Sequence, residues 1–356
     1  MRALERVRRV LVIRHRAGGD VLLATPALRA LHAGLPEASI DVLTSRGFRG
    51  LLEGNPDVGT ILDFDRTSLA SQAALYARLL RGGYDVVLDL VSNPRSAWMT
   101  ALTRARIRMG YNLRGRSWAY TRSLPREPIG PSGPVLRYAP EAALDFVRAL
   151  GLPTQGLQLT FRVSARAEDT VARWLRAAFL DRGRPLAACL PTGSWPAKTW
   201  APERFAAAMD LLAQDAEVLW CWGPGEREAV EACRARMKAP STLAPASDWQ
   251  ELGALLRRCT VWVGNDSGPK HLAVALGVPT VTVFGPTHPT TWHPPKGPHV
   301  VVEAQGLDCL HCNANTCPLP GDRHMRCMRD VGVERVVHAA RHIMETFPKE
   351  APCASR

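Results

Sequence analysis

Apolar residues in the first half of the chain fall into short blocks, separated by polar or amphipathic stretches. The blocks have the length and the β-branched content of buried strands. They are VRRVLVIR (7–14), SIDVLT (39–44), VGTILDF (58–64), YDVVLDLV (84–91) and ARIRMGY (105–111). Residues 46–54 and 69–81, which lie between these blocks, are expected to be helical. Alternation of this kind predicts a parallel sheet that is covered by helices.

The segment after the first block, DVLLATPALRALHAG, has an apolar stripe with helical spacing. The members of the stripe are Val21, Ala24, Leu28, Leu31 and Leu35. Pro26 leaves two interpretations open. Either Thr25 caps a helix that has Pro26 at its first position, or the helix begins at Asp20 and kinks.

The second half of the chain repeats the alternation, after a Pro- and Gly-rich segment (125–140) that reads as an irregular loop and a helix, EAALDFVRALG. Its strand-like blocks are RPLAACLP (184–191), EVLWCWG (217–223), TVWVGND (260–266) and PTVTVFG (279–285). We therefore predict an α/β protein with two Rossmann-like parallel-sheet domains that face each other across a cleft. The expected boundaries are 1–160 for the N-terminal domain, 161–183 for a linker with a helix, and 184–356 for the C-terminal domain.

Three turns that follow strand-like blocks carry candidate chemistry. The first, RHRAGGD, passes through Gly18 and Gly19 and ends in Asp20. Its glycines do not spell G-x-G-x-x-G, so a dinucleotide site there has little support. The Asp20 carboxylate can cap the following helix, or it can act as a general base at a strand end.

The other two turns lie in the second half of the chain. Residues 192–194 and Lys198 offer backbone N–H groups, hydroxyls and a point charge that suit a diphosphate; the alternative is an ordinary loop with an exposed lysine. In WVGNDSGPKH, Asp266 can accept hydrogen bonds from ribose hydroxyls or cap the next helix. His271 can face the same ligand or pack in the core.

Charge is unevenly distributed along the 356 residues. The formal net charge is +12, and residues 1–150 hold +9 of it, with 22 arginines against 13 acidic residues. Eight arginines and no acidic residue lie between Arg95 and Arg126. This segment is expected to attract phosphates, carboxylates or an anionic membrane surface; the alternative is a solvated, arginine-rich face. We expect a cytoplasmic protein, because no apolar block is long enough for a spanning helix or a signal peptide.

Four cysteines cluster near the end of the chain within residues 309–327. They are Cys309, Cys312, Cys317 and Cys327. Four thiolates can bind Zn²⁺ tetrahedrally, and such an ion would be structural. Redox-labile thiols and plain structural thiols are the alternatives.

Taken together and in order, these motifs resemble the ADP-heptose:lipopolysaccharide heptosyltransferase family (glycosyltransferase family 9). The matching phrases are Gly19-Asp20-Val21-Leu22 through Thr25-Pro26 and Leu28, LLEGNPDV (51–58), YDVVLDL with NPRSAW, GSWPAKTW, NDSGPKHLAVALGVPTVTVFGPT and the terminal C-x-x-C…CP…RCM pattern. The resemblance covers nearly the whole chain. It implies the GT-B fold, and an inverting transfer of heptose from ADP-heptose or a similar nucleotide sugar to a lipopolysaccharide inner-core acceptor.

The resemblance also implies roles for single residues. Asp20 would be the catalytic base. The donor-binding residues would be Thr192, Gly193, Ser194, Lys198, Asp266, Ser267, Gly268 and His271, and the acceptor-binding residues would be Arg16, Arg95 and Ser96. Arg16 departs from the family pattern, as does Lys270, which stands where a hydrophobic residue is common.

The implied reaction requires no cofactor, and a contribution from Mg²⁺ stays open. The acceptor would be an anionic lipopolysaccharide precursor, so we expect peripheral attachment to the inner face of the inner membrane. A transferase or epimerase of the same fold that acts on another nucleotide sugar is the alternative. A basic nucleic-acid-binding protein is disfavoured, because it leaves Asp20, Lys198 and the NDSG turn without a role.

Overall fold

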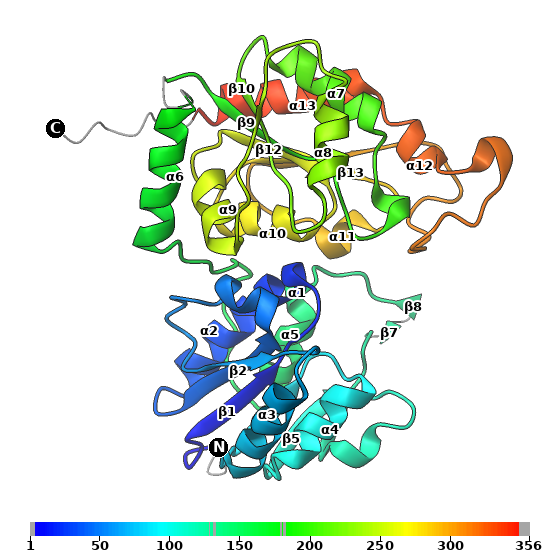
Figure 1. Ribbon diagram of the computed structural model, residues 1–356. Coiled ribbons are helices and arrows are strands. Elements are labelled where there is room, and N and C mark those ends of the chain that lie inside the picture. The colour runs from blue at the N-terminus through cyan, green and yellow to red at the C-terminus, as the bar shows by residue number, and fades with distance from the viewer. Residues whose placement is uncertain (1–3, 128, 131–132, 179, 181–182, 349–356) are drawn as a thin grey trace. The chain divides into compact units, whose positions relative to one another are not determined.

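The computed structural model describes residues 4–127, 129–130, 133–178, 180 and 183–348 (Figure 1). The chain divides into two compact units between Arg162 and Val163. Among the described residues, no helix is both long and apolar enough to span a bilayer.

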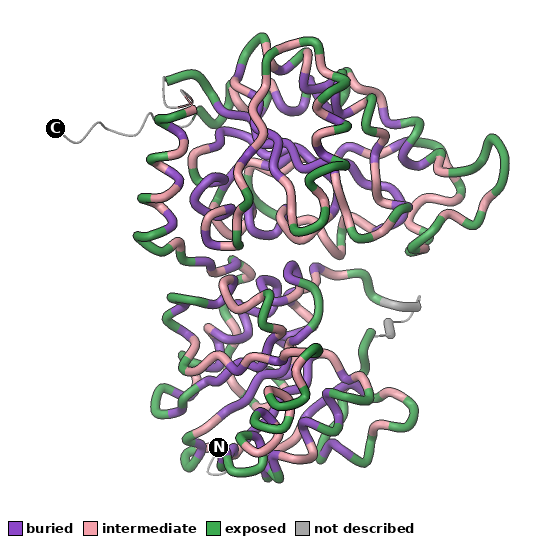
Figure 2. The backbone as a smooth tube through the Cα atoms, in the orientation of Figure 1, coloured by how far each residue is buried: buried purple, intermediate pink, exposed green. Residues whose placement is uncertain are grey.

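Unit 1 is built on a six-stranded sheet in which every pairing is parallel. Its strands are β1 (Arg9–Ile13), β2 (Ser39–Ser45), β3 (Ile61–Phe64), β4 (Val86–Asp89), β5 (Ile107–Tyr111) and β6 (Arg122–Leu124), in the order β3-β2-β1-β4-β5-β6. The central strands are buried on both faces, as their continuous apolar sequence predicts (Figure 2).

Helices cover both faces of this sheet. They are α1 (Gly18–Leu23), α2 (Thr25–Gly34), α3 (Leu69–Arg81), α4 (Pro94–Leu102) and α5 (Pro140–Ala149), with 3₁₀ turns η1 (Arg46–Leu51) and η2 (Ser117–Ala119). Helix α2 packs against α5, and α3 packs against α4 (Figure 1). The expected helix at 46–54 is thus only a shorter 3₁₀ turn.

Pro26 explains why α1 and α2 are separate helices. Pro26 has no N–H with which to bond the carbonyl of Leu22 four residues earlier. The Thr25 hydroxyl donates to that carbonyl instead, at 2.7 Å. The helix therefore begins before Pro26 and breaks at Ala24, and Thr25 does not act as its cap.

Unit 2 repeats the architecture with a second all-parallel sheet. Its strands are β9 (Leu186–Leu190), β10 (Glu217–Trp220), β11 (Thr242–Leu243), β12 (Val261–Asn265), β13 (Thr280–Phe284) and β14 (His299–Glu303), in the order β11-β10-β9-β12-β13-β14. Its helices are α6 (Ala165–Ala177), α7 (Pro202–Leu212), α8 (Arg227–Arg234), α9 (Trp249–Leu256), α10 (Gly268–Ala275), α11 (Pro289–Trp292), α12 (Arg326–Arg329) and α13 (Val333–Thr346), with 3₁₀ turns η3 (Pro196–Lys198) and η4 (Gly321–Arg323).

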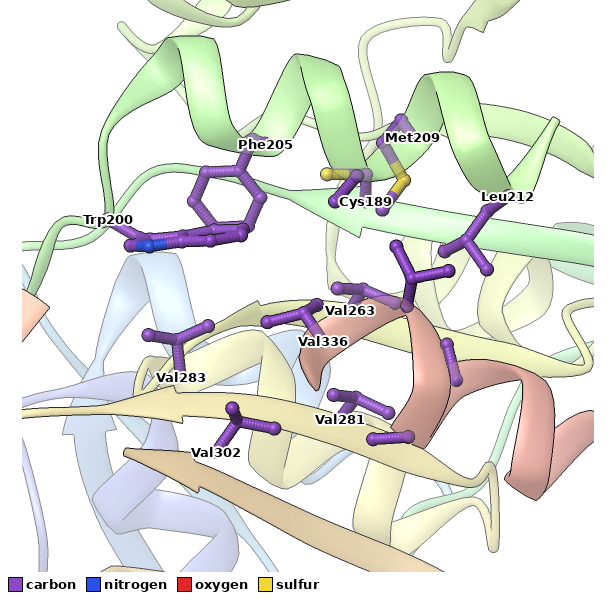
Figure 3. Close-up of a cluster of buried hydrophobic side chains, with 14 of the residues drawn as sticks. Cys189, Trp200, Phe205, Met209, Leu212, Val263, Val281, Val283, Val302 and Val336 are labelled. Atoms are coloured by element: carbon purple, nitrogen blue, oxygen red, sulfur yellow. The ribbon is translucent and has the colours of Figure 1, made fainter. Parts of the chain in front are cut away.

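The main core of unit 2 lies between the sheet and helices α7 and α13. Trp200 and Phe205 meet edge to face with ring centroids 4.9 Å apart, and valines of β12 and β13 pack below them (Figure 3). Aromatic pairs of this kind contribute about 0.5–1.5 kcal/mol beyond the area that they bury. This core fixes the strand ends on which the candidate site of unit 2 is built.

Regular structure also occurs in the segment expected to be an irregular loop (125–140) and in the segment expected to be a linker with a helix (161–183). Within 125–140, β7 (Ile129–Gly130) pairs antiparallel with β8 (Gly133–Pro134); residues 128 and 131–132 lie outside the described residues. Within 161–183, helix α6 packs against α9 and so is part of unit 2; residues 179 and 181–182 lie outside the described residues.

Candidate functional site

Each sheet reverses its strand order at one place. In unit 1 the chain moves outward from β1 to β2 and β3 and then crosses back to β4; in unit 2 it does the same from β9 to β12. The turns that follow the two central strands of each sheet therefore lie at the same edge. This edge is where open α/β sheets bind their ligands. All three turns singled out in the sequence follow one of these four strands.

Asp20 lies in the first turn of α1, in the turn that follows β1. Its carboxylate pairs with the Arg14 guanidinium at 2.7 Å, and both side chains remain partly exposed. Within the described residues no side-chain hydrogen bond caps α1, so the structure does not show Asp20 in the capping role that the sequence left open. The residue before the helix, Ala17, has φ 54, a conformation that costs a non-glycine residue about 1–3 kcal/mol.

A cavity of about 640 Å³ opens in unit 1 beside this turn. It is lined by His15, Arg16, Ala17, Ser45, Phe48, Arg66, Asn93, Pro94 and Arg95. The lining contains three guanidinium groups and no carboxylate. A concave site of this charge is suited to an anionic group, because guanidinium forks bind carboxylates and phosphates in a bidentate manner.

The pKa of His15 reflects the positive charge around the cavity. Burial and the neighbouring cations Arg16 and Arg95 lower the pKa of His15 to about 4. The imidazole is therefore neutral at physiological pH. Its Nε2 lies 3.3 Å from the Asn93 side-chain amide, and its Nδ1 is buried without a partner within the described residues.

The two predicted acceptor residues on α4 have different surroundings. The Arg95 side chain is exposed at the cavity, and its guanidinium lies over the Phe64 ring, 5.3 Å from the centroid. Ser96 is fully buried, and its hydroxyl completes a capping box with Asn93 at the start of α4. Ser96 therefore holds the helix start that presents Arg95. A direct contact between Ser96 and an acceptor stays a prediction.

A buried carboxylate, that of Asp89, stabilises the turn between β4 and α4. Asp89 at the end of β4 accepts hydrogen bonds from the backbone N–H groups of Val91 and Ser92 and from the Tyr120 hydroxyl. Burial raises the pKa of Asp89. Because all of these contacts are internal, Asp89 supports the turn rather than a ligand.

In unit 2, the candidate residues gather around Asp266 at the end of β12. Its carboxylate binds the Lys198 ammonium at 2.9 Å and the Thr287 hydroxyl at 2.8 Å. It also pairs with the Lys270 ammonium, which in turn donates to the Trp292 carbonyl at 2.8 Å. Lys198, the predicted diphosphate ligand, is thus held against a carboxylate, beneath the rings of Trp195 and Trp292.

Two cations for one carboxylate leave the cluster with a net positive charge. Burial alone would raise the pKa of Asp266, but the Lys270 and Lys198 ammonium groups lower it below its usual range, so Asp266 is ionised. Burial lowers the pKa of His271, which is therefore neutral. His271 Nδ1 and the Ser267 hydroxyl are buried without a partner among the described residues, so both can receive a polar ligand.

The turn after β9 lies beside this cluster because Asn265 ties the two together. The Asn265 side chain accepts from the backbone N–H of Trp200 and donates to the Pro191 carbonyl. Between these anchors, Gly193 and Ser194 are at least partly exposed. The Thr192 hydroxyl donates to the Glu226 carboxylate at 2.8 Å, so Thr192 is oriented by a residue that the sequence did not indicate.

The cysteine segment of unit 2 has thiols that influence one another. Burial, and then Cys309, Cys312 and Cys317, raise the pKa of Cys327 to about 11. All four are free cysteines. Among the described residues, no group of three or more His, Cys, Asp or Glu side chains is arranged to hold a metal ion. Zinc at this segment stays a prediction.

Sequence reasoning missed several residues of both sites. They are Arg14, His15, Arg66 and Asn93 in unit 1, and Glu226, Thr287 and Trp292 in unit 2. His15 and Asn93 carry a signal that was available, because each closely follows the end of a predicted strand in the central part of the sheet. Lys270 was noted as unusual, but its burial beside Asp266 was not foreseen.

Comparisons with known proteins agree with this architecture. The family model described as glycosyltransferase family 9 (heptosyltransferase) matches residues 72–321. Lipopolysaccharide heptosyltransferase 3 of Escherichia coli is 26% identical over 287 residues, which cover 78% of this chain and 83% of that protein.

Two solved structures share the fold over nearly their whole length. A family 9 glycosyltransferase from Veillonella parvula aligns with a TM-score of 0.83 and 22% identity, covering 97% of this chain and 99% of that one. The ADP-heptose lipopolysaccharide heptosyltransferase II of Escherichia coli aligns with a TM-score of 0.76 and 21% identity, covering 95% and 99%. These likenesses confirm the predicted fold class, an α/β protein with two Rossmann-like domains of the GT-B type. Since the family model spans well over half of its residues, the chain belongs to glycosyltransferase family 9 and is a glycosyltransferase.

Proposed function

We propose that this enzyme transfers a heptose from ADP-heptose to an inner-core acceptor of lipopolysaccharide, with inversion at the anomeric carbon. The observation that carries the proposal is the family match over residues 72–321. The relatives support the substrates: one is named a lipopolysaccharide heptosyltransferase, and one solved structure is titled an ADP-heptose lipopolysaccharide heptosyltransferase.

In this proposal Asp20 is the general base. Its carboxylate takes the proton of the acceptor hydroxyl while that oxygen attacks the anomeric carbon. The bond between this carbon and the ADP oxygen breaks at the same time, and ADP leaves with the electron pair. The ion pair with Arg14 fixes the direction in which the carboxylate points.

The cluster around Asp266 binds the donor. Lys198 exchanges its contact with Asp266 for the diphosphate, while Lys270 keeps Asp266 neutralised. The backbone N–H groups of residues 192–194 and the start of α10 at Gly268 add further donors to the charge that grows on the leaving ADP. His271 and Ser267 offer unpartnered polar atoms to the nucleotide sugar.

The arginine-lined cavity of unit 1 binds the acceptor. Its guanidinium groups, from Arg16, Arg66 and Arg95, hold the carboxylates or phosphates that a lipopolysaccharide precursor carries. The acceptor is a lipid, so the enzyme works in the cytoplasm as a peripheral protein at the inner face of the inner membrane. Because a single displacement needs only a base and a stabilised leaving group, the proposal gives no step to a cofactor; chelation with EDTA measures any dependence on Mg²⁺.

The Asp20→Asn variant tests the proposal. We expect transfer to fall about 10²–10⁴-fold, the usual contribution of one base, while ADP binding stays at the wild-type level. Glu37→Gln, at an exposed acidic position of unit 1, is the matched control and should transfer normally. Normal transfer by Asp20→Asn would contradict the base assignment. Mass analysis of the sugar separates transfer from donor hydrolysis or epimerisation, either of which as the main reaction would contradict the proposed activity.

A further inference from the structure

Two tryptophans of unit 1 are exposed to solvent and lie against each other. Trp98 on α4 is 62% exposed and Trp118 on η2 is 50% exposed. Their ring centroids are 4.7 Å apart in an edge-to-face arrangement. Large aromatic side chains are rarely left in water in this way, and an exposed pair of them marks a surface that is covered in use.

The local structure fixes the pair rather than leaving it mobile. Helix α4 packs against η2 and against β4. The Trp118 indole N–H donates to the Gly115 carbonyl at 3.2 Å. Each ring is thus carried by an element that packs against the rest of unit 1, which lowers the ordering cost upon binding.

Arginines flank in sequence the two elements that carry the pair. Arg104 follows the end of α4, Arg114 precedes η2, and both are exposed. Within the described residues, neither forms an ion pair with a carboxylate. Arg108 donates through its Nε to the Ala119 carbonyl, which brings a third guanidinium against η2. The elements that carry the rings thus have cationic residues next to them in the chain, and no acidic residue lies between Arg95 and Arg126.

Helix α4 links this surface to the arginine-lined cavity. Arg95, which lines the cavity, precedes Trp98 by three residues, and such residues share one face of a helix about 4.5 Å apart along its axis. An anionic group in the cavity and an apolar layer at the tryptophans would therefore contact adjacent parts of one helix.

We propose that Trp98 and Trp118 form an interfacial anchor that enters the headgroup region of an anionic lipid bilayer, with the flanking arginines bound to lipid phosphates. Indole rings favour this region because they have an apolar body and a polar N–H. The arginine charge selects anionic over neutral lipid, and salt weakens the attraction by screening. The inference rests on the proposed function in one respect, since there the acceptor is a lipid.

The test measures co-sedimentation of the full chain with vesicles of phosphatidylcholine, alone or mixed with phosphatidylglycerol. The Trp98→Ser, Trp118→Ser double variant removes the rings, and the Arg104→Gln, Arg114→Gln double variant removes charge. Leu69→Ser is the matched control, because Leu69 is an 82% exposed apolar residue of α3 in the same unit. Thermal unfolding of each variant shows that it is folded.

We expect wild type and Leu69→Ser to bind anionic vesicles in a salt-sensitive manner and to bind neutral vesicles poorly. The tryptophan double variant should lose about tenfold or more in affinity for anionic vesicles, and the arginine double variant should lose most of its preference for them. Wild-type binding by the tryptophan variant would overturn the proposal, as would equal binding of wild type to both lipids. A tryptophan-dependent dimer without vesicle binding would assign the surface to a second copy and also overturn it.

Transfer assays separate this inference from the proposed function. With an acceptor stripped of its acyl chains, the tryptophan double variant should transfer heptose as the wild type does. Absence of transfer by the wild type, with vesicle binding intact, would contradict the proposed function and leave the anchor standing.

Discussion

Lys270→Met is expected to weaken the binding of ADP by about 10–100-fold. Lys270 is a fully buried lysine, and its ammonium contacts the Asp266 carboxylate and the Trp292 carbonyl. Methionine has nearly the same length and shape, so the substitution removes the charge and leaves the packing. Burial lowers the pKa of Lys270, and the neighbouring Asp266 carboxylate opposes that effect. Because the substitution keeps the packing, it measures what the ammonium contributes.

The magnitude follows from the competition for Lys198. In the wild type, Lys198 can leave Asp266 for a diphosphate because Lys270 still neutralises the buried carboxylate. In the variant, departure of Lys198 would strand that carboxylate, at a cost of about 3–5 kcal/mol. A hydrogen bond from Lys198 to a charged phosphate contributes only about 1.5–3 kcal/mol. Lys198 therefore stays with Asp266, its contribution is lost, and the affinity falls by the smaller of the two amounts.

Isothermal titration calorimetry with ADP and with adenosine measures this effect. Adenosine lacks the diphosphate, so its affinity should be unchanged in Lys270→Met. Lys296→Met, at an exposed lysine of the same unit, controls for a general loss of positive charge. Wild-type affinity for ADP in Lys270→Met would refute the reasoning. Equal losses for ADP and adenosine would also refute it, because they would indicate a distorted site rather than a missing charge.

Three further predictions concern stability and the cysteines. The pKa of His15 is about 4 in the folded protein and near 6.5 in the unfolded chain, so the free energy of unfolding should fall as the pH drops through that window, by at most about 3 kcal/mol for this residue. Urea titrations at pH 7 and pH 5 should show a smaller fall for His15→Asn than for the wild type. An equal fall would contradict the assignment. Ala17→Gly should stabilise the protein by about 0.5–1 kcal/mol, because Ala17 has φ 54°. Ala27→Gly within α2 is the contrast and should destabilise the protein by about 1 kcal/mol. Lower thermal stability of both variants would argue against strain at Ala17. Elemental analysis of protein purified without chelator should find about one zinc ion per chain, held by Cys309, Cys312, Cys317 and Cys327 and lost in Cys312→Ser. Absence of the ion would show that these four are plain thiols.

The strands could be predicted because short runs of apolar residues indicate buried strands. Strands of a parallel sheet covered on both faces are continuous runs of apolar residues, and β9, β12 and β13 all fall within their predicted blocks. At residues 46–54 the sequence predicted a helix, and the structure has only the short 3₁₀ turn η1. Its apolar spacing resembles that of a helix, although only Leu51 of η1 is buried.

The partners of the site residues could not be read from the sequence, because strand order decides them. Lys198 and Asp266 are 68 positions apart and meet only because β9 and β12 are neighbours. The sequence identified both residues as donor ligands but treated them as independent. Asp20 is a similar case: its type and place were predicted, but its partner Arg14 depends on where α1 begins.

The charges of the two sites suggest why each contains more cations than a ligand alone would require. In unit 2 the second cation, Lys270, leaves Asp266 with a permanent partner, so that Lys198 is free to exchange between a carboxylate and a phosphate. In unit 1 Arg14 holds Asp20, while Arg16 and Arg95 face the cavity. In both places a fixed ion pair sets the carboxylate, and other cations remain for the anionic substrate. A site with one cation fewer could not release a cation to the substrate without leaving its buried carboxylate unpaired, so its affinity would fall by the contribution of that cation.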